Sequence, residues 1–290
     1  MNKDKPKEKN YRTTLIDIKG TSNDDLYILA NLSPLVDEPE SIWSVVCKAI
    51  HKPKPYYEVI YKVPEWLTAM ERGDNGYLYA VSDEGVIHEF NGNDWKVFDL
   101  ERGCVLNAIW TTKKNIFSVG NGVALVKDIN SAQTKLDKNN YELFGVHGVG
   151  DDDVYSVGSS GVISHYDGKE WTLVDSPDPN ASFLCVKCIS KSEIYIAGGK
   201  GVLYCLSDSK WKKLDCPKDI TITSIEWYKG NLYAVAGVDG VFVLKNGKLD
   251  KIKDVVVYQL ETIGDALFAI GNSMLAQFDG SGWWGGDLDL

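Results

Sequence analysis

The sequence lacks any long apolar run, and no apolar stretch follows its charged first ten residues, MNKDKPKEKN. A helix that crosses a bilayer needs about 20 predominantly apolar residues, so no spanning segment is predicted. A secretory signal needs an apolar core after its charged start, and that core is missing too. We therefore expect a cytoplasmic protein whose residues 1–11 form a flexible N-terminal segment.

Positively charged residues are fewer than negatively charged ones. The chain has 31 Lys and Arg against 41 Asp and Glu, which gives a formal net charge of −10. Phosphate backbones and anionic lipids repel such a surface, so nucleic acid and membranes are excluded as expected partners. A basic protein would be attracted instead. We expect a protein partner, basic in character, and a chain that is monomeric on its own.

Sequence motifs of catalysis are also missing. There is no Gly-x-Ser-x-Gly and no His-Glu-x-x-His. Of the four histidines (His51, His88, His147 and His165), His88 and His165 occupy equivalent third-strand positions of a repeating pattern, which marks them as repeat residues rather than a catalytic pair. Glycine-rich stretches lie where hairpins are expected, rather than at the start of a phosphate-binding helix. We assign no catalytic residue and expect no cofactor. Carboxylate pairs for sugar chemistry stay open, since acidic residues are frequent everywhere.

Six cysteines are present, which in a cytoplasmic protein are expected to be reduced thiols. Cys185 and Cys188 form a Cys-x-x-Cys pair that could begin a zinc site, but the usual second tight pair is missing. Both cysteines fall in one predicted strand, where an offset of three residues points side chains to opposite faces. We therefore predict buried thiols, with neither a metal site nor disulfides.

The sequence does contain a motif that recurs about every 38 residues, which is a spacing typical of repeat architectures. Its clearest copy reads VYSVGSSGVISHYDGKEW, at 154–171. Related copies lie at 78–95, 194–211, 232–249 and 267–283.

One copy predicts four short antiparallel strands. In the copy at 141–180, Asp167-Gly168 is the signal of a tight hairpin, and Gly158 and Gly161 bound a turn in which glycine allows a positive φ. The strands are expected at 142–149, 154–157, 162–166 and 171–174. Four such strands cannot bury both faces alone, but units stacked radially bury them against each other. The repeat therefore predicts the blade of a β-propeller.

Counting copies gives an all-β fold, a single closed β-propeller of seven four-stranded blades over residues 12–290. The blades are expected at 12–65, 66–102, 103–140, 141–180, 181–219, 220–254 and 255–290. The first is the least regular, so six blades are the alternative. A tryptophan opens the fourth strand at Trp95, Trp171, Trp211 and Trp283. A repeated aromatic residue is expected to pack between blades, with ligand binding as the alternative.

The repeated strand-and-turn, hydrophobic-aromatic-x-Val-Gly-x-x-Gly, and the Asp/Asn-Gly-x-x-Trp hairpin resemble the divergent repeats of bacterial β-propellers in the WD40/YVTN/BNR-like group. The resemblance covers nearly the whole chain and implies architecture alone. No Trp-Asp dipeptide ends a strand, and the Ser-x-Asp-x-Gly-x-x-Trp box is absent. The third predicted blade lacks the Asp-Gly hairpin, and the sixth has Leu249 where the others have tryptophan.

One column of the repeat is mostly polar. It lies on the first strand of each blade, and the residue before it is apolar in every copy. Its members are Lys19, Glu71, Ile109, His147, Lys187, Glu226 and Glu261. Because innermost strands surround the axis of a propeller, we predict that the six polar members line the central channel. Two interpretations stay open: a channel that binds an ion or small molecule, and ion pairs between blades such as Glu261–Lys19–Glu71.

Residues 31–41 lengthen the connection between the second and third strands of the first blade. A long loop that breaks a repeat is often functional, and this one is acidic with an apolar centre. Together with acidic turns elsewhere it predicts a partner-binding face, with a purely decorative loop as the alternative. The candidates are Leu35, Val36, Asp37, Glu38, Glu40, Asp83, Glu84 and Asp239.

These observations favour a non-enzymatic, protein-binding propeller. The more specific hypothesis is a cytoplasmic immunity-type inhibitor of a bacterial toxin, by analogy with a class of small, acidic, non-catalytic proteins. The alternative is a hydrolase or a glycan- or small-ligand-binding propeller with its site at the central channel.

Overall fold

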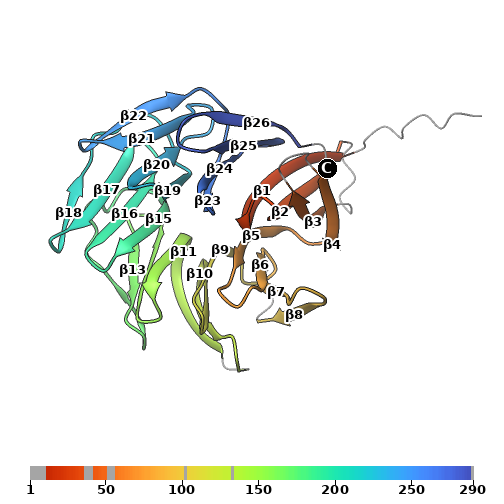
Figure 1. Cartoon of the computed structure of the whole chain (residues 1–290). Coiled ribbons are helices and arrows are strands. Elements are labelled where there is room, and N and C mark those ends of the chain that lie inside the picture. The colour runs from red at the N-terminus through yellow and green to blue at the C-terminus, as the bar shows by residue number, and fades with distance from the viewer. Residues whose placement is uncertain (1–10, 36–41, 51–55, 101–102, 132–133, 289–290) are drawn as a thin grey trace, which may run out of the picture.

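The computed structural model describes residues 11–35, 42–50, 56–100, 103–131 and 134–288, so the predicted flexible segment lies almost wholly outside it. Over these ranges the chain forms strands and turns with no helix, and hence no helix that could cross a membrane. The antiparallel sheets are arranged around a central axis (Figure 1). This arrangement is a β-propeller, and it confirms the all-β prediction.

In the described part of the chain, five sheets have four strands each, and every sheet follows the chain order. The first two contain β1 (Tyr11–Ser22), β2 (Asp25–Pro34), β3 (Trp43–Ile50) and β4 (Tyr56–Val63), and then β5 (Leu67–Arg72), β6 (Leu78–Ser82), β7 (Val86–Phe90) and β8 (Trp95–Asp99). The next contains β15 (Phe183–Ser190), β16 (Glu193–Gly198), β17 (Val202–Ser207) and β18 (Lys210–Lys213). The last two contain β19 (Ser224–Tyr228), β20 (Asn231–Val235), β21 (Val241–Lys245) and β22 (Lys248–Lys253), and then β23 (Gln259–Ile263), β24 (Ala266–Ile270), β25 (Met274–Phe278) and β26 (Trp283–Asp287).

The prediction of seven four-stranded blades is wrong for residues 103–180, which form one six-stranded sheet. Its strands are β9 (Leu106–Thr111), β10 (Asn115–Asp128), β11 (Thr134–Gly150), β12 (Asp153–Gly158), β13 (Ile163–Tyr166) and β14 (Trp171–Leu173). The predicted boundary at 140–141 falls inside β11, whose first half pairs with β10 and whose second half pairs with β12. The pairing of β10 with β11 shifts register between Asn121 and Val123, opposite residues 138–142, so the predicted boundary coincides with a β-bulge rather than with a turn.

Three of the four strands predicted from the copy at 141–180 are present with nearly the expected bounds, as the ranges of β12, β13 and β14 show, whereas the first is the second half of β11. Gly161 has a φ of 66°, as a turn glycine should. Gly158 has a different role: a Cβ there would lie 1.9 Å from the carbonyl oxygen of Glu142 on β11. The glycine that ends this strand is therefore required by close backbone approach rather than by a positive φ.

Buried apolar clusters join each sheet to the next, and the repeated tryptophans lie in them as predicted. Trp95 stacks on Tyr61 of the preceding sheet, with ring centroids 4.0 Å apart. Trp171 packs with Tyr166 and with β10 residues between the two halves of the six-stranded sheet. Trp211 and Trp283 lie in the corresponding clusters further along the chain.

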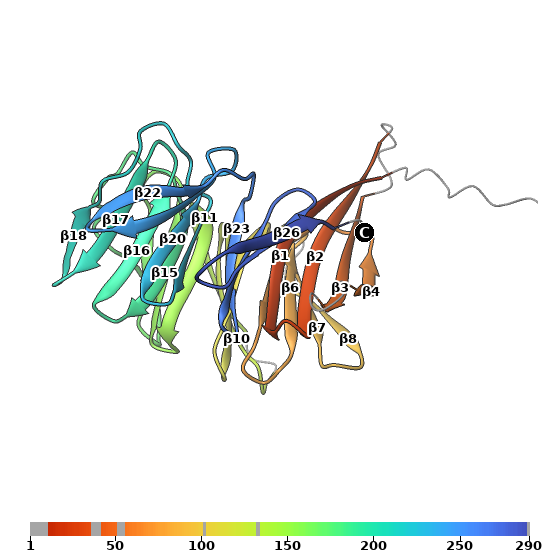
Figure 2. The same ribbon diagram turned by 45° about the horizontal axis from the view of Figure 1, so that its top comes forward.

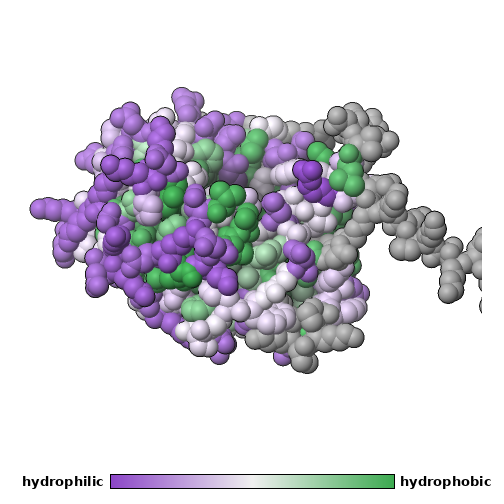
Figure 3. Space-filling view, turned by 90° about the horizontal axis from the view of Figure 1, so that it is seen from above, coloured by the Kyte–Doolittle hydropathy of each residue, from purple (hydrophilic) through white to green (hydrophobic). Residues whose placement is uncertain are grey.

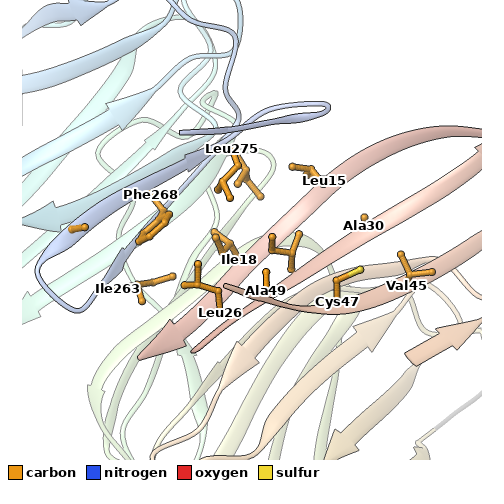
Figure 4. Packing of buried hydrophobic residues seen from close by; sticks show 13 residues of the cluster. Leu15, Ile18, Leu26, Ala30, Val45, Cys47, Ala49, Ile263, Phe268 and Leu275 are labelled. Carbon is orange, nitrogen blue, oxygen red and sulfur yellow. The ribbon is translucent and has the colours of Figure 1, made fainter. Parts of the chain in front are cut away.

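The first and last sheets are in direct contact. Figure 4 shows Leu15, Ile18 and Leu26 facing Phe268 and Leu275 across this junction. The Leu15 N–H also donates a hydrogen bond of 2.8 Å to the carbonyl oxygen of Asn272. Seen from the side, β1 and β2 reach past the other strands at one end of the molecule (Figure 2).

Candidate functional site

A cavity of about 310 Å³ lies on the central axis. Residues of β1, β5, β9, β11, β15, β19 and β23 line it, so each four-stranded sheet contributes one strand and the six-stranded sheet contributes two. Every member of the predicted column borders this space: Lys19, Glu71, Ile109, His147, Lys187, Glu226 and Glu261. The structure thus brings these residues together, while binding of a ligand by them stays a prediction.

Among the residues that the structure describes, Lys19 is at the centre of the largest ion-pair group. Its Nζ lies 2.6 Å from Glu261 Oε2, 3.6 Å from Glu71 Oε2 and 3.8 Å from Asp17 Oδ1. These carboxylates come from the last, second and first sheets. The group matches the ion-pair interpretation of the column and links three sheets through one ammonium group.

Asp17 was missed by the sequence analysis, although it lies two residues before Lys19 and therefore on the same face of β1. Its carboxylate accepts hydrogen bonds from the backbone N–H groups of Ile18 (2.9 Å) and Met70 (3.0 Å), so it also connects the first two sheets. Strand alternation around a polar column residue is the signal that could have found it.

On the opposite side of the cavity, Lys187 Nζ lies 2.7 Å from Glu226 Oε2. His147 Nδ1 accepts a hydrogen bond from the backbone N–H of Cys188 at 3.2 Å, which places the proton of the neutral ring on Nε2. Burial, followed by Lys187 and Lys19, holds the pKa of His147 well below its usual value. His147 is therefore neutral near pH 7 and adds no charge.

Burial raises the pKa of three of the cavity carboxyl groups. It raises the pKa of Asp17 to about 6 and that of Glu71 to about 7, against the opposing effect of Lys19. Burial raises the pKa of Glu226 as well, against Lys187. The surrounding carboxylates raise the pKa of Lys19 well above its usual value despite its burial. Both lysines are matched to acids from neighbouring sheets, an arrangement that holds sheets together.

The described residues contain no group of three or more His, Cys, Asp or Glu side chains that could hold a metal ion. All six cysteines lie in the described ranges, and each is a free thiol. Cys185 packs with the cluster shared with β19, whereas Cys188 packs in the cluster shared with β12, so the two point to opposite faces as predicted. Burial raises the pKa of Cys185 to about 12, so this thiol is protonated near pH 7.

A second hollow, of about 530 Å³, lies beside the turn from β6 to β7, and we call it the Trp66 groove. Its lining residues are Ile42, Pro64, Glu65, Trp66, Asp83, Glu84, Val86, Val97 and Asp99. Two of the predicted partner-binding residues, Asp83 and Glu84, are among them. Glu65 and Trp66 were missed, because they lie in the connection from β4 to β5, which has no repeated pattern.

The other predicted partner-binding residues are dispersed. Leu35 follows β2 and is 58% exposed. Asp239 is partly exposed in the turn between β20 and β21, in a different sheet. Val36, Asp37, Glu38 and Glu40 lie outside the described residues. The sequence therefore found part of one acidic groove, together with two positions elsewhere in turns of the same type.

The wider surface is largely hydrophilic. Figure 3 shows one side of the molecule, where polar side chains cover much of the area and smaller apolar areas lie between them. Apolar side chains exposed by more than half include Leu35, Val59, Val97, Leu173 and Val238, and they come from several different sheets. Among the described residues, an apolar contact surface is thus distributed around the propeller rather than gathered in one sheet.

No protein-family model matches the chain. It is similar to the immune protein Tsi7 of Pseudomonas aeruginosa, with 27% identity over 146 residues. That match covers 48% of this chain and 46% of Tsi7, so it spans about half the length of the curated relative.

Among solved structures, the chain is similar to a catalytically inactive virginiamycin B lyase from Staphylococcus aureus, at a TM-score of 0.75 and 10% identity over 91% of this chain and 94% of that one. The WD40 propeller domain of Doa1 superposes at a TM-score of 0.67 and 10% identity, with 90% and 94% coverage. YCF48 bound to the D1 peptide superposes at a TM-score of 0.66 and 8% identity, over 92% of this chain and 93% of that one. At these identities the likeness shows the β-propeller fold alone.

Proposed function

We propose that this chain is a non-enzymatic, protein-binding propeller that acts in the cytoplasm as an immunity-type inhibitor of a bacterial toxin. The observation that carries the proposal is the similarity to an immune protein over 146 residues. The net charge of −10 is consistent with it, since an acidic surface attracts a basic effector and repels nucleic acid and membranes.

The proposed contact face is the one formed by turns between second and third strands. In an antiparallel blade these turns all leave the same end of the sheet, and the connections between blades leave there too. Asp83, Glu84 and Asp239 belong to such turns, and Leu35 follows β2 on the same side. Rim carboxylates would mainly raise the association rate, whereas buried apolar contacts such as Leu35 would supply affinity.

We also propose that the sheets close into a ring with seven blade positions around the axis. The six-stranded sheet would occupy two of these positions, and each four-stranded sheet would occupy one. Two observations support it. Both β9 and β11 border the central cavity, as the first strands of two blades would, and the first and last sheets pack against each other. We also propose that the free chain is a monomer. Light scattering of the purified chain tests the monomer, and an experimental density map tests the ring.

The decisive functional experiment co-expresses the chain with the product of the adjacent gene in a bacterial host and then measures growth and complex formation. We expect growth to be rescued and a stable complex to form. Replacing Asp83, Glu84 and Asp239 by their amides should slow association by at least about tenfold and reduce its dependence on salt.

The matched control changes the acidic residues Asp94 and Asp208, which lie in turns between third and fourth strands at the other end of the sheets. This variant should bind like the unaltered chain. A toxin neutralised equally well by all variants would move the contact away from the proposed face. Failure of every neighbouring gene product to bind would overturn the immunity function.

A further inference from the structure

The Trp66 groove is shaped before any partner arrives. The backbone N–H of Asp83 donates a hydrogen bond of 3.1 Å to the carbonyl oxygen of Trp66, which fixes the turn from β6 to β7 against the connection from β4 to β5. Ser82 Oγ accepts hydrogen bonds from the N–H groups of Glu84 and Val86, both at 3.3 Å. A preformed site of this kind loses little conformational entropy on binding.

Two carboxylates of the groove, those of Asp83 and Glu84, have no cation beside them in the described part of the chain. Among the described residues, no lysine or arginine lies within ion-pair distance of Asp83 or Glu84. Partial burial raises the pKa of Asp83, and the nearby Glu84 and Glu65 raise it further, while no cation acts to lower it. A positive charge placed here would relieve this repulsion.

Glu65 is held in place by a histidine behind the groove. His88 Nε2 lies 3.1 Å from Glu65 Oε2, and His88 Nδ1 lies 2.9 Å from the Tyr61 hydroxyl. Burial lowers the pKa of His88, although Glu65 opposes the shift, so the ring is neutral near pH 7. The Nε2–H group of the neutral ring donates a hydrogen bond to Glu65, and Nδ1 accepts a hydrogen bond from the Tyr61 hydroxyl. No positive charge of the histidine therefore offsets the Glu65 carboxylate.

The rest of the lining is apolar. Trp66 and Val86 border the hollow, and Ile42 and Val97 are 41% and 54% exposed beside it. An indole next to carboxylates suits a planar guanidinium, which stacks on aromatic rings and bonds to carboxylates in a forked geometry. Its aliphatic stem would contact the valine side chains.

We propose that the Trp66 groove is a socket for an arginine side chain of a protein partner, with the guanidinium between Trp66 and the carboxylates of Asp83, Glu84 and Glu65. The inference rests on the proposed function in so far as the arginine is supplied by the bound toxin. The volume of about 530 Å³ lies within the usual range for specific sites, about 300–1,000 Å³, and leaves room for the backbone that carries the side chain.

The test titrates the full-length ¹⁵N-labelled chain with Nα-acetyl-arginine amide and follows the amide and indole signals by NMR. The Trp66 indole is assigned from its loss in Trp66→Phe. We expect saturable shifts at the Trp66 indole and at the amides of Asp83, Glu84 and Val86, with a dissociation constant on the order of 1–10 mM. The neutral isostere Nα-acetyl-citrulline amide should bind at least about tenfold more weakly.

Two variants make the result specific. Asp83→Asn combined with Glu84→Gln should weaken binding of the probe by at least about tenfold, whereas Asp94→Asn combined with Asp208→Asn, at the other end of the sheets, should bind it like the unaltered chain. The proposal is overturned by shifts that fail to saturate below about 50 mM, by equal binding of the citrulline probe, or by unchanged binding to the double variant. No toxin is needed for this readout, so its failure leaves the immunity function standing, and failure to find a toxin leaves the socket standing.

Discussion

Lys19 on β1 and Glu261 on β23 form an ion pair of 2.6 Å that joins the first sheet of the propeller to the last. The lysine side chain is only 9% exposed, and Asp17 and Glu71 complete its surroundings. An ammonium group so placed neutralises charge that would otherwise be buried without a partner.

Replacing Lys19 by Met should therefore destabilise the chain strongly. It leaves buried carboxylates without their cation, which typically costs about 3–5 kcal/mol. The control is Lys212→Met, which breaks an exposed pair with Asp208 and should cost less than about 1 kcal/mol. Urea unfolding measures the free energy of unfolding of both variants. Equal values for Lys19→Met and Lys212→Met would show that the ion pairs of Lys19 contribute little to stability.

The pH dependence of the free energy of unfolding should reflect the titration of Glu71. The pKa of Glu71 is raised in the folded chain to about 7, from an ordinary value of 4.5. The native state therefore binds a proton that the unfolded chain has released between these values, and the free energy of unfolding falls as pH rises through this window.

Glu71→Gln removes this titration, so the fall between about pH 4.5 and 7 should become shallower by about 2 kcal/mol. Asp17, whose pKa is raised to about 6, continues to act in the same direction. Unfolding at several pH values provides the comparison. Parallel profiles for the two chains would assign the dependence to other groups.

Trp171→Ala should cost about 3 kcal/mol, because the indole fills space between the two halves of the six-stranded sheet. The matched control is Leu173→Ala in the same strand, where the side chain is 58% exposed. It should change the free energy of unfolding by less than about 0.5 kcal/mol. A loss below about 1 kcal/mol for Trp171→Ala would place the indole at the surface.

Gly158→Ala should be among the more damaging small changes. The added methyl group would lie 1.9 Å from the carbonyl oxygen of Glu142, so backbone must move, and we expect a loss of about 2 kcal/mol or more. Gly199→Ala, where nothing lies within 4 Å of the added carbon, should be nearly neutral. Thermal unfolding of the pair tests the close approach, and two equally stable variants would argue against it.

The sequence was sufficient for features that repeat. Asp167-Gly168 and Trp171 marked strand ends, because a tight turn and a packed aromatic impose the same residue types in each copy. The column that includes Lys19 and Glu261 could be found by counting, because equivalent strands present equivalent positions to the axis.

Features that depend on contacts between different elements could not be found in this way. Glu65 and Trp66 belong to the groove only because the turn carrying Asp83 folds beside them. The fusion of two predicted blades into one sheet could not be found by counting copies either, since the repeat implies a turn at 140–141 where β11 has only a β-bulge.

The continuation of β11 through this bulge also limits how such a ring can change its size during evolution. Repeat proteins gain or lose units by duplication and deletion, and these events are tolerated where a boundary falls in a turn. Most boundaries in this chain meet that condition, such as the connection between β18 and β19. Deleting 103–140 would instead cut β11 in two and leave half a strand exposed. Descendants with fewer or more units should therefore differ elsewhere, and residues 103–180 should be inherited as one block.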